Sequence, residues 1–312
     1  MRPMERNQVF IEENTPRDGL QNEAVLLSLE ERVALVDALS TCGFGRIQIG
    51  SFVNPKRVPQ MAHTEELYRR VRKVPGVVYS ALVLNRKGLE RAAACGIPHV
   101  SLYVSASETH SLKNSNRSVA DALREAIDLM GEARGHGLRV RAGVMNAFGC
   151  QFEGRVPFQR VLEIVQRFLA LDVDEVSLAD TAGVAHPQQV EEAVARAREI
   201  CPVPLSLHFH ETYGFGLANV YAAWRAGGRH FDASCGGLGG CPFIPGVAGN
   251  VATEDVLHLF EEAGIDTGVS LVELSRVVAQ LEARLGRSLP GRYARLAKSS
   301  ERVGSCEGSG TA

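Results

Sequence analysis

The chain has 312 residues, a formal net charge of -2 at pH 7 and a pI of about 6.5, which indicates neither nucleic acid nor an acidic membrane as a partner. Its length suits one large domain or two small ones. Its apolar runs are much shorter than the roughly 18 residues of a membrane span, and the starting segment MRPMERNQVF lacks the apolar core of a signal peptide. We therefore expect a cytoplasmic protein.

Short β-rich runs alternate with amphipathic helical stretches along the chain. The expected strands cover 9–13, 46–50, 77–84, 99–105, 139–145, 175–179, 205–210 and 231–234. The expected helices cover 29–41, 64–74, 86–94, 119–136, 158–171, 187–200, 217–226 and 253–263. Eight strand–helix units predict an α/β fold of the (β/α)8 or TIM barrel type. A doubly wound open sheet would usually use fewer strands, and the Gly-x-Gly-x-x-Gly turn is missing.

A further helical pattern at 269–285 is surplus to the eight units. We expect residues 1–265 to form the barrel domain and residues 266–298 to form a C-terminal helical appendage packed on it. Residues 299–312, which are rich in Ser and Gly, are expected to be a disordered tail.

Two histidines lie one residue apart near the end of the seventh expected strand. Side chains at i and i+2 of a strand point to one face, so His208 and His210 converge. Asp18 follows the first strand and Asn250 follows the eighth, and polar groups of a barrel enzyme gather at these carboxyl ends. Such a mixed nitrogen and oxygen site suits Mg²⁺ or Mn²⁺. The alternative is a structural histidine pair. Asp180, after the sixth strand, either orients a ligating histidine or serves as a turn or N-cap residue.

The segment 236–250 holds six glycines and contains Cys241. Glycines allow many backbone conformations, so this loop could close over a ligand. A thiol is mostly protonated at neutral pH, so Cys241 could donate a proton. The alternative is an ordinary loop cysteine.

Together these residues resemble the 3-hydroxy-3-methylglutaryl-CoA (HMG-CoA) lyase family, a group of metal-dependent acyl-CoA lyases built on a TIM barrel. The resemblance extends from about residue 8 to 285. The matching segments are PRDGLQNE at 16–23, SFVNPKRVPQM at 51–61, SLADTAGV at 177–184, HFHETYG at 208–214 and GGLGGCPFIPGVAGNVATED at 236–255.

The resemblance implies a divalent cation, Mg²⁺ or Mn²⁺, and an acyl-CoA substrate that is cleaved to acetyl-CoA and an oxo acid. It also implies a homodimer or higher homo-oligomer. Arg17 would stabilise the thioester enolate, Asp18 would carry the hydroxyl proton, Cys241 would protonate the enolate, and Glu254 would support the cysteine loop. The implied metal ligands are Asp18, His208, His210 and Asn250; the implied catalytic set is Arg17, Asp18, His208, Cys241 and Glu254; the implied substrate-binding residues are Gln21, Gln48, Ser177 and Asp180.

Three positions depart from the family pattern. Gln48 stands where a glutamate is expected, Ala24 where a lysine is usual, and Gly143 where a tyrosine is usual. Replacement of Glu by Gln removes a negative charge and adds an amide donor, which could suit the shorter carboxylate of (R)-citramalyl-CoA, with pyruvate as the product. Gly143 suggests extra room for a bulkier substituent. The sequence is also compatible with a condensing acyl-CoA synthase on the same barrel and with a non-catalytic metal-binding barrel.

Overall fold

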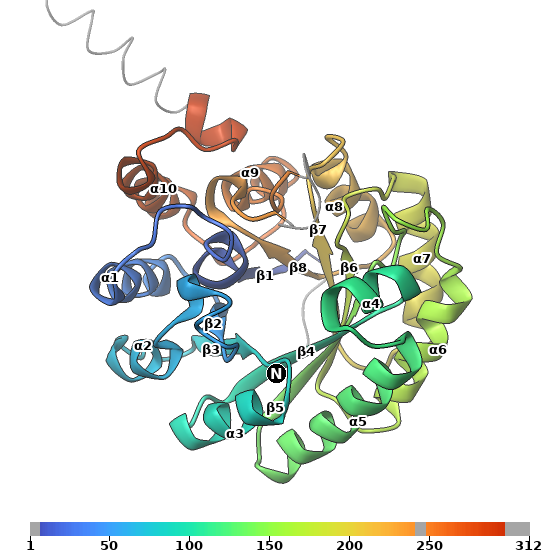
Figure 1. Ribbon diagram of the computed structural model, residues 1–312. Helices are drawn as coiled ribbons and strands as arrows, with labels where there is room; N and C mark the ends of the chain where they lie inside the picture. The colour runs from blue at the N-terminus through green and yellow to red at the C-terminus, as the bar shows by residue number, and fades with distance from the viewer. Residues whose placement is uncertain (1–6, 241–247, 297–312) are drawn as a thin grey trace, which may run out of the picture.

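Eight parallel strands close into a barrel in this computed structural model, which describes residues 7–240 and 248–296 (Figure 1). Each strand pairs with the next along the chain, and β8 pairs with β1 to close the ring. The strands are β1 (Phe10–Glu13), β2 (Arg46–Ser51), β3 (Val78–Leu82), β4 (His99–Ser105), β5 (Arg139–Met145), β6 (Glu175–Asp180), β7 (Leu205–Phe209) and β8 (His230–Ala233). The predicted TIM barrel is confirmed.

The helices surround the barrel as an outer layer (Figure 1). They are α1 (Leu29–Ser40), α2 (Thr64–Arg70), α3 (Arg86–Cys95), α4 (Glu108–Ser115), α5 (Val119–Gly135), α6 (Phe158–Leu169), α7 (Pro187–Ile200), α8 (Gly216–Arg225), α9 (Thr253–Glu262) and α10 (Leu271–Leu285). Short helical turns are η1 (Thr15–Gly19), η2 (Pro59–Met61) and η3 (Cys235–Gly237). Within the described ranges, no helix has the length and apolar character needed to cross a bilayer.

Helix α4 was not predicted from the sequence. Its residues lack an apolar stripe, and Leu112 on it is 49% exposed. Its first turn is stabilised by the N-cap residue Ser107, whose hydroxyl accepts a hydrogen bond from the backbone N–H of His110 at 3.1 Å. Helix α2 is shorter than predicted, since Val71 already has an extended backbone.

Alternation along the strands separates an apolar outer layer from a polar barrel interior. On β4, Val100, Leu102 and Val104 are buried against the surrounding helices, while Ser101 and Tyr103 face inward, where they contact side chains of other strands. The hydrophobic core therefore lies between barrel and helices, and the interior is free to carry charge and catalytic groups.

The lower barrel interior contains a buried network of ion pairs. Arg141 contacts Glu12 at 2.5 Å and Asp232 at 2.6 Å, and Arg46 contacts Glu12 and Glu175 at 2.7 Å each. All five side chains are at least nine-tenths buried. Each charge has an opposite partner, as a buried charge requires. The network connects the strands beneath the mouth of the barrel.

The segment after α10 closes over the start of the glycine-rich loop. Helix α10 packs beside α1 and α9 (Figure 1). Gly291 then donates its N–H to the carbonyl of Gly236 at 3.0 Å, and the backbone N–H of Tyr293 binds the carboxylate of Asp255 at 2.7 Å. The helical extension thus holds η3 in place, while the expected tail at 299–312 lies outside the described residues.

Candidate metal and catalytic site

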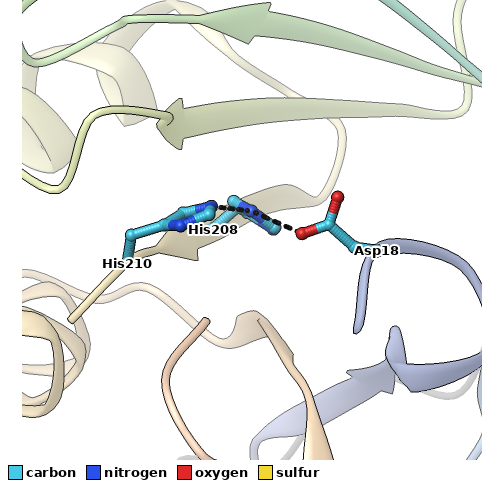
Figure 2. Close-up of side chains that lie close together, drawn as sticks. All are labelled: Asp18, His208 and His210. Atoms are coloured by element: carbon cyan, nitrogen blue, oxygen red, sulfur yellow. Dashed lines mark hydrogen bonds and ion pairs between the residues drawn. The ribbon is translucent and has the colours of Figure 1, made fainter. Parts of the chain in front are cut away.

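Asp18, His208 and His210 converge at the carboxyl ends of β1 and β7. The two histidine Nε2 atoms lie 3.1 Å apart, and His208 Nε2 lies 3.9 Å from an Asp18 carboxylate oxygen (Figure 2). One ligand atom from each residue falls within 4.8 Å of the other two. Figure 2 shows Asp18 reaching from η1 toward the imidazoles of β7. The structure therefore brings these three predicted ligands together.

The far nitrogens of both imidazoles have acceptors. His208 Nδ1 lies 3.1 Å from an Asp232 carboxylate oxygen, and His210 Nδ1 lies 3.2 Å from the carbonyl of Ala248. Carboxylate and carbonyl oxygens accept hydrogen bonds, so each Nδ1 carries the proton. Each Nε2 then presents a lone pair, and two lone pairs that face each other suit a shared cation.

Asn250, the fourth predicted ligand, lies beside Asp18. Its Nδ2 donates to Asp18 at 2.8 Å and to the carbonyl of Leu238 at 2.9 Å. Its Oδ1 is buried and has no hydrogen-bond partner among the described residues. A buried amide oxygen without a partner is unfavourable unless a ligand satisfies it. Two imidazole nitrogens, a carboxylate and this amide oxygen fit a divalent cation such as Mg²⁺ or Mn²⁺.

The charges around the site keep its ligands in their metal-binding forms. Burial alone would raise the pKa of Asp18, but Arg17 and the two histidines hold that pKa well below its ordinary value. Burial, assisted by His208, lowers the pKa of His210 to about 4. At neutral pH, Asp18 is therefore ionised and His210 is neutral, as metal coordination requires.

Arg17 is fixed beside the ligands by two side chains. Its Nε donates to the Gln48 oxygen, and its terminal nitrogen contacts Asp18. Gln48 is fully buried on β2 and donates its amide N–H to Ser101 at 3.2 Å. In this arrangement Gln48 orients the guanidinium, and its direct contact with substrate stays a prediction.

Asp180 is the last residue of β6, and its carboxylate binds the turn that follows the strand. Its two carboxylate oxygens accept the backbone N–H groups of Val184 and Ala185 at 3.0 Å each. The carboxylate that orients His208 is instead Asp232, which sequence reasoning missed. The available signal was an acidic residue within the otherwise largely apolar strand β8. Contact between Asp180 and substrate stays a prediction.

Three other predicted site residues, Gln21, Ser177 and Glu254, lie among the described residues. Ser177 lies inside the barrel, where its hydroxyl accepts from Arg141 at 3.0 Å. Gln21 is half-buried in the turn after η1. Glu254 accepts the N–H of Gly236 at 2.9 Å, and burial raises its pKa to about 7. Glu254 thus supports the first residues of the glycine-rich loop.

The glycine-rich loop begins against Asp18 and Asn250. Gly239 has φ of +110°, and a Cβ there would lie 2.4 Å from Asn250 Nδ2, so only glycine fits. The carbonyl of Gly240 accepts a hydrogen bond from Asn22 of the β1–α1 loop. Cys241 follows directly and lies outside the described residues.

Comparisons with known proteins agree with this geometry. The HMGL-like family model matches residues 8–281. The chain belongs to the HMGL-like family. The predicted resemblance to HMG-CoA lyases is therefore confirmed, as is the prediction that the chain is a lyase.

Two relatives and one solved structure show how similar this HMGL-like chain is to members with named activities. The 3-hydroxy-3-isohexenylglutaryl-CoA/hydroxy-methylglutaryl-CoA lyase of Pseudomonas aeruginosa is 41% identical over 90% of this chain and 94% of that protein. The (R)-citramalyl-CoA lyase of Chloroflexus aurantiacus is 41% identical over 90% of this chain and 92% of that protein. An HMG-CoA lyase from A. baumannii, solved with coenzyme A and 3-methylmalate, has a TM-score of 0.90 at 37% identity and covers 94% of this chain and 96% of that one.

Proposed function

We propose that this HMGL-like chain is a divalent-metal-dependent carbon–carbon lyase that cleaves HMG-CoA or a close analogue to acetyl-CoA and an oxo acid. The observation that supports this most directly is the convergence of Asp18 and two histidine Nε2 atoms beside the fixed guanidinium of Arg17. A bound cation would lower the pKa of the substrate's tertiary hydroxyl, and either Mg²⁺ or Mn²⁺ suits the donor set.

The protein's own residues account for the remaining chemistry. Asp18, ionised and beside the site, accepts the hydroxyl proton, and the carbon–carbon bond breaks to leave a thioester enolate. Arg17 supplies a permanent positive charge where negative charge develops on that enolate. Gln48 fixes the direction of the guanidinium through its hydrogen bond to Nε.

Cys241 is proposed to protonate the enolate, since it directly follows a glycine whose carbonyl is anchored near the site. Glu254 holds the start of this loop by accepting a hydrogen bond from the N–H of Gly236. Closure of the loop would exclude water from the enolate. Gln21, Ser177 and Asp180 remain proposed substrate contacts. The substrate is proposed to be an acyl-CoA, because an A. baumannii relative was solved with coenzyme A. A homo-oligomeric assembly also remains a proposal.

Gln48 favours a second candidate, (R)-citramalyl-CoA lyase activity. An amide in place of a carboxylate removes repulsion toward a substrate carboxylate held close to the cation. A relative equally identical to this chain carries that activity in its name.

The test is a panel of HMG-CoA, (R)-citramalyl-CoA and 3-hydroxy-3-isohexenylglutaryl-CoA with the full chain and Mg²⁺ or Mn²⁺, in which release of acetyl-CoA is measured. We expect release from at least one substrate and its loss after chelation of the metal. The Cys241→Ala variant should lose activity without losing metal binding. Inertness toward the whole panel would contradict the proposal. Net thioester hydrolysis with an oxo acid and acetyl-CoA would favour a condensing synthase. Cation binding without turnover, with activity restored by Gln48→Glu, would favour a non-catalytic metal-binding barrel.

A further inference from the structure

Three residues on adjacent strands lie in one row across the upper barrel wall. Tyr103 on β4 pairs in register with Gly143 on β5, and Gly143 pairs with Ser177 on β6. The Tyr103 hydroxyl donates to the Ser177 Oγ at 3.3 Å. The tyrosine side chain therefore spans two strand spacings and crosses the intervening residue.

This crossing depends on the missing side chain at position 143. A Cβ on Gly143 would lie 2.1 Å from two ring carbons of Tyr103 and 2.7 Å from a third. Real Cβ atoms do not approach so closely, so the ring occupies the space that a side chain at 143 would fill. The expectation that Gly143 creates extra room is wrong, because Tyr103 fills that room.

The ring lies near the catalytic group. Ser177 Oγ also accepts from Arg141, Arg141 contacts Asp232, and Asp232 holds His208. Among the residues of β4, which are all described, Tyr103 is the only one that is partly exposed. Because its hydroxyl is already bonded to Ser177, the surface that it exposes inside the barrel mouth is mainly aromatic.

We propose that Tyr103, seated over Gly143, forms an apolar wall that limits the size of the substituent at C3 of the acyl-CoA substrate. This inference rests on the proposed lyase function. The polar groups of such a substrate would be held by the metal ligands and Arg17 at the ends of β1 and β7. The apolar branch at C3 then meets the β4–β6 side, where an aromatic face offers matching chemistry.

The experiment measures kcat/KM for HMG-CoA and for 3-hydroxy-3-isohexenylglutaryl-CoA in each variant of the full chain and uses their ratio. General damage to the protein cancels in this ratio, whereas a change in the wall does not. The informative variants are Tyr103→Ala, Tyr103→Phe and Gly143→Ala. The matched control is Tyr221→Ala, which removes a tyrosine that is 40% exposed on α8.

We expect the wild-type chain to prefer the methyl substrate. Tyr103→Ala should shift the kcat/KM ratio toward the substrate with the long C3 branch by about tenfold or more. The reason is that removal of the ring would make space for several carbon atoms of that branch. Tyr103→Phe and Tyr221→Ala should keep the wild-type ratio. Gly143→Ala should displace the ring and lower kcat/KM for the methyl substrate.

Four outcomes would overturn the inference. A wild-type chain that cleaves the long substrate as well as the methyl one has no such wall. An unchanged ratio in Tyr103→Ala, with activity retained, rejects the wall while leaving the lyase proposal intact. A shift in Tyr103→Phe as large as that in Tyr103→Ala would assign the effect to the hydroxyl. If the wild-type chain cleaves neither substrate, the inference fails, and the lyase proposal fails as well only if (R)-citramalyl-CoA is also inert.

Discussion

Asp232 and His208 share a hydrogen bond of 3.1 Å between a carboxylate oxygen and Nδ1 at the base of the metal-ligand group. The same carboxylate oxygen lies 2.6 Å from Arg141, so its position is fixed from two sides. Arg141 holds the pKa of Asp232 below its ordinary value against the opposing effect of burial. The carboxylate therefore stays ionised, directs the imidazole and keeps Nε2 free to bind a cation.

Asp232→Asn should weaken divalent metal binding by about 10- to 100-fold, because the amide can turn either its oxygen or its nitrogen toward Nδ1. Titration calorimetry with Mn²⁺ measures this directly, without reference to turnover. Asp266→Asn, a change of the same kind at an exposed position, is the control. Equal Mn²⁺ affinity in wild type and a folded Asp232→Asn variant would show that Asp232 does not orient His208; if that variant fails to fold, Asp232→Glu takes its place.

Metal should also stabilise the fold through His210 and Asn250. A ligand that binds only the folded state adds about 2.7 kcal/mol to the free energy of unfolding when its free concentration is 100 times Kd. Thermal unfolding of the wild-type chain should therefore shift upward with Mn²⁺ and return after chelation. His210→Ala and Asn250→Ala should each reduce the shift. If both variants show the same Mn²⁺-induced shift as the wild-type chain, the ion binds at another site.

The barrel and the convergence of Asp18, His208 and His210 could be predicted because they depend on local patterns. Strand alternation, helical periodicity and the His-x-His spacing act within a few residues, and the topology of a barrel then brings strand ends together. The pairing of Asp18 with His208 follows from that rule, since both stand at carboxyl ends of strands.

The contacts across the barrel interior could not be predicted in the same way. Tyr103 crosses Gly143 because of the register between β4 and β5, which no local pattern specifies. Asp232 and Arg141 meet across strands far apart in the sequence. Sequence reasoning gave Asp180 two readings, and only the structure shows its carboxylate bound to a turn. Which inward polar residues touch depends on register and rotamer, and both are fixed by packing.

Arg17 and Gln48 should act as one unit in catalysis. Arg17→Met should lower kcat by about 10²- to 10³-fold, as loss of a charge that stabilises a developing oxyanion does. Gln48→Ala should lower kcat by about 10- to 100-fold, because a misplaced guanidinium loses part of that effect. The double variant should be no slower than Arg17→Met, measured by release of acetyl-CoA.

Ser101→Ala is the control for this pair, since it removes the partner of the Gln48 amide N–H but keeps the contact with Arg17. It should retain most of the activity. Additive losses in the Arg17→Met/Gln48→Ala double variant would mean that Gln48 acts on the substrate independently of Arg17.

Glu254 should make the stability of the fold depend on pH. Burial raises its pKa from an ordinary value of 4.5 to about 7, and nearby Asp255 and Glu13 act in the same direction. The folded state then binds more protons than the unfolded state between these values. The stabilising contribution of protonated Glu254 is fully present below about pH 4.5 and is lost as the pH rises through about 7.

The Glu254→Gln variant isolates this effect, because glutamine keeps an acceptor for Gly236 and does not titrate. Urea unfolding of both proteins at pH 5 and pH 8 should show the wild-type chain losing on the order of 3 kcal/mol relative to the variant between these conditions. Glu13 is present in both proteins, and because it raises the pKa of Glu254, the measured difference includes the coupling between these two carboxyl groups. If the difference in unfolding free energy between the two proteins stays constant from pH 5 to pH 8, Glu254 is ionised throughout this range, which contradicts the prediction.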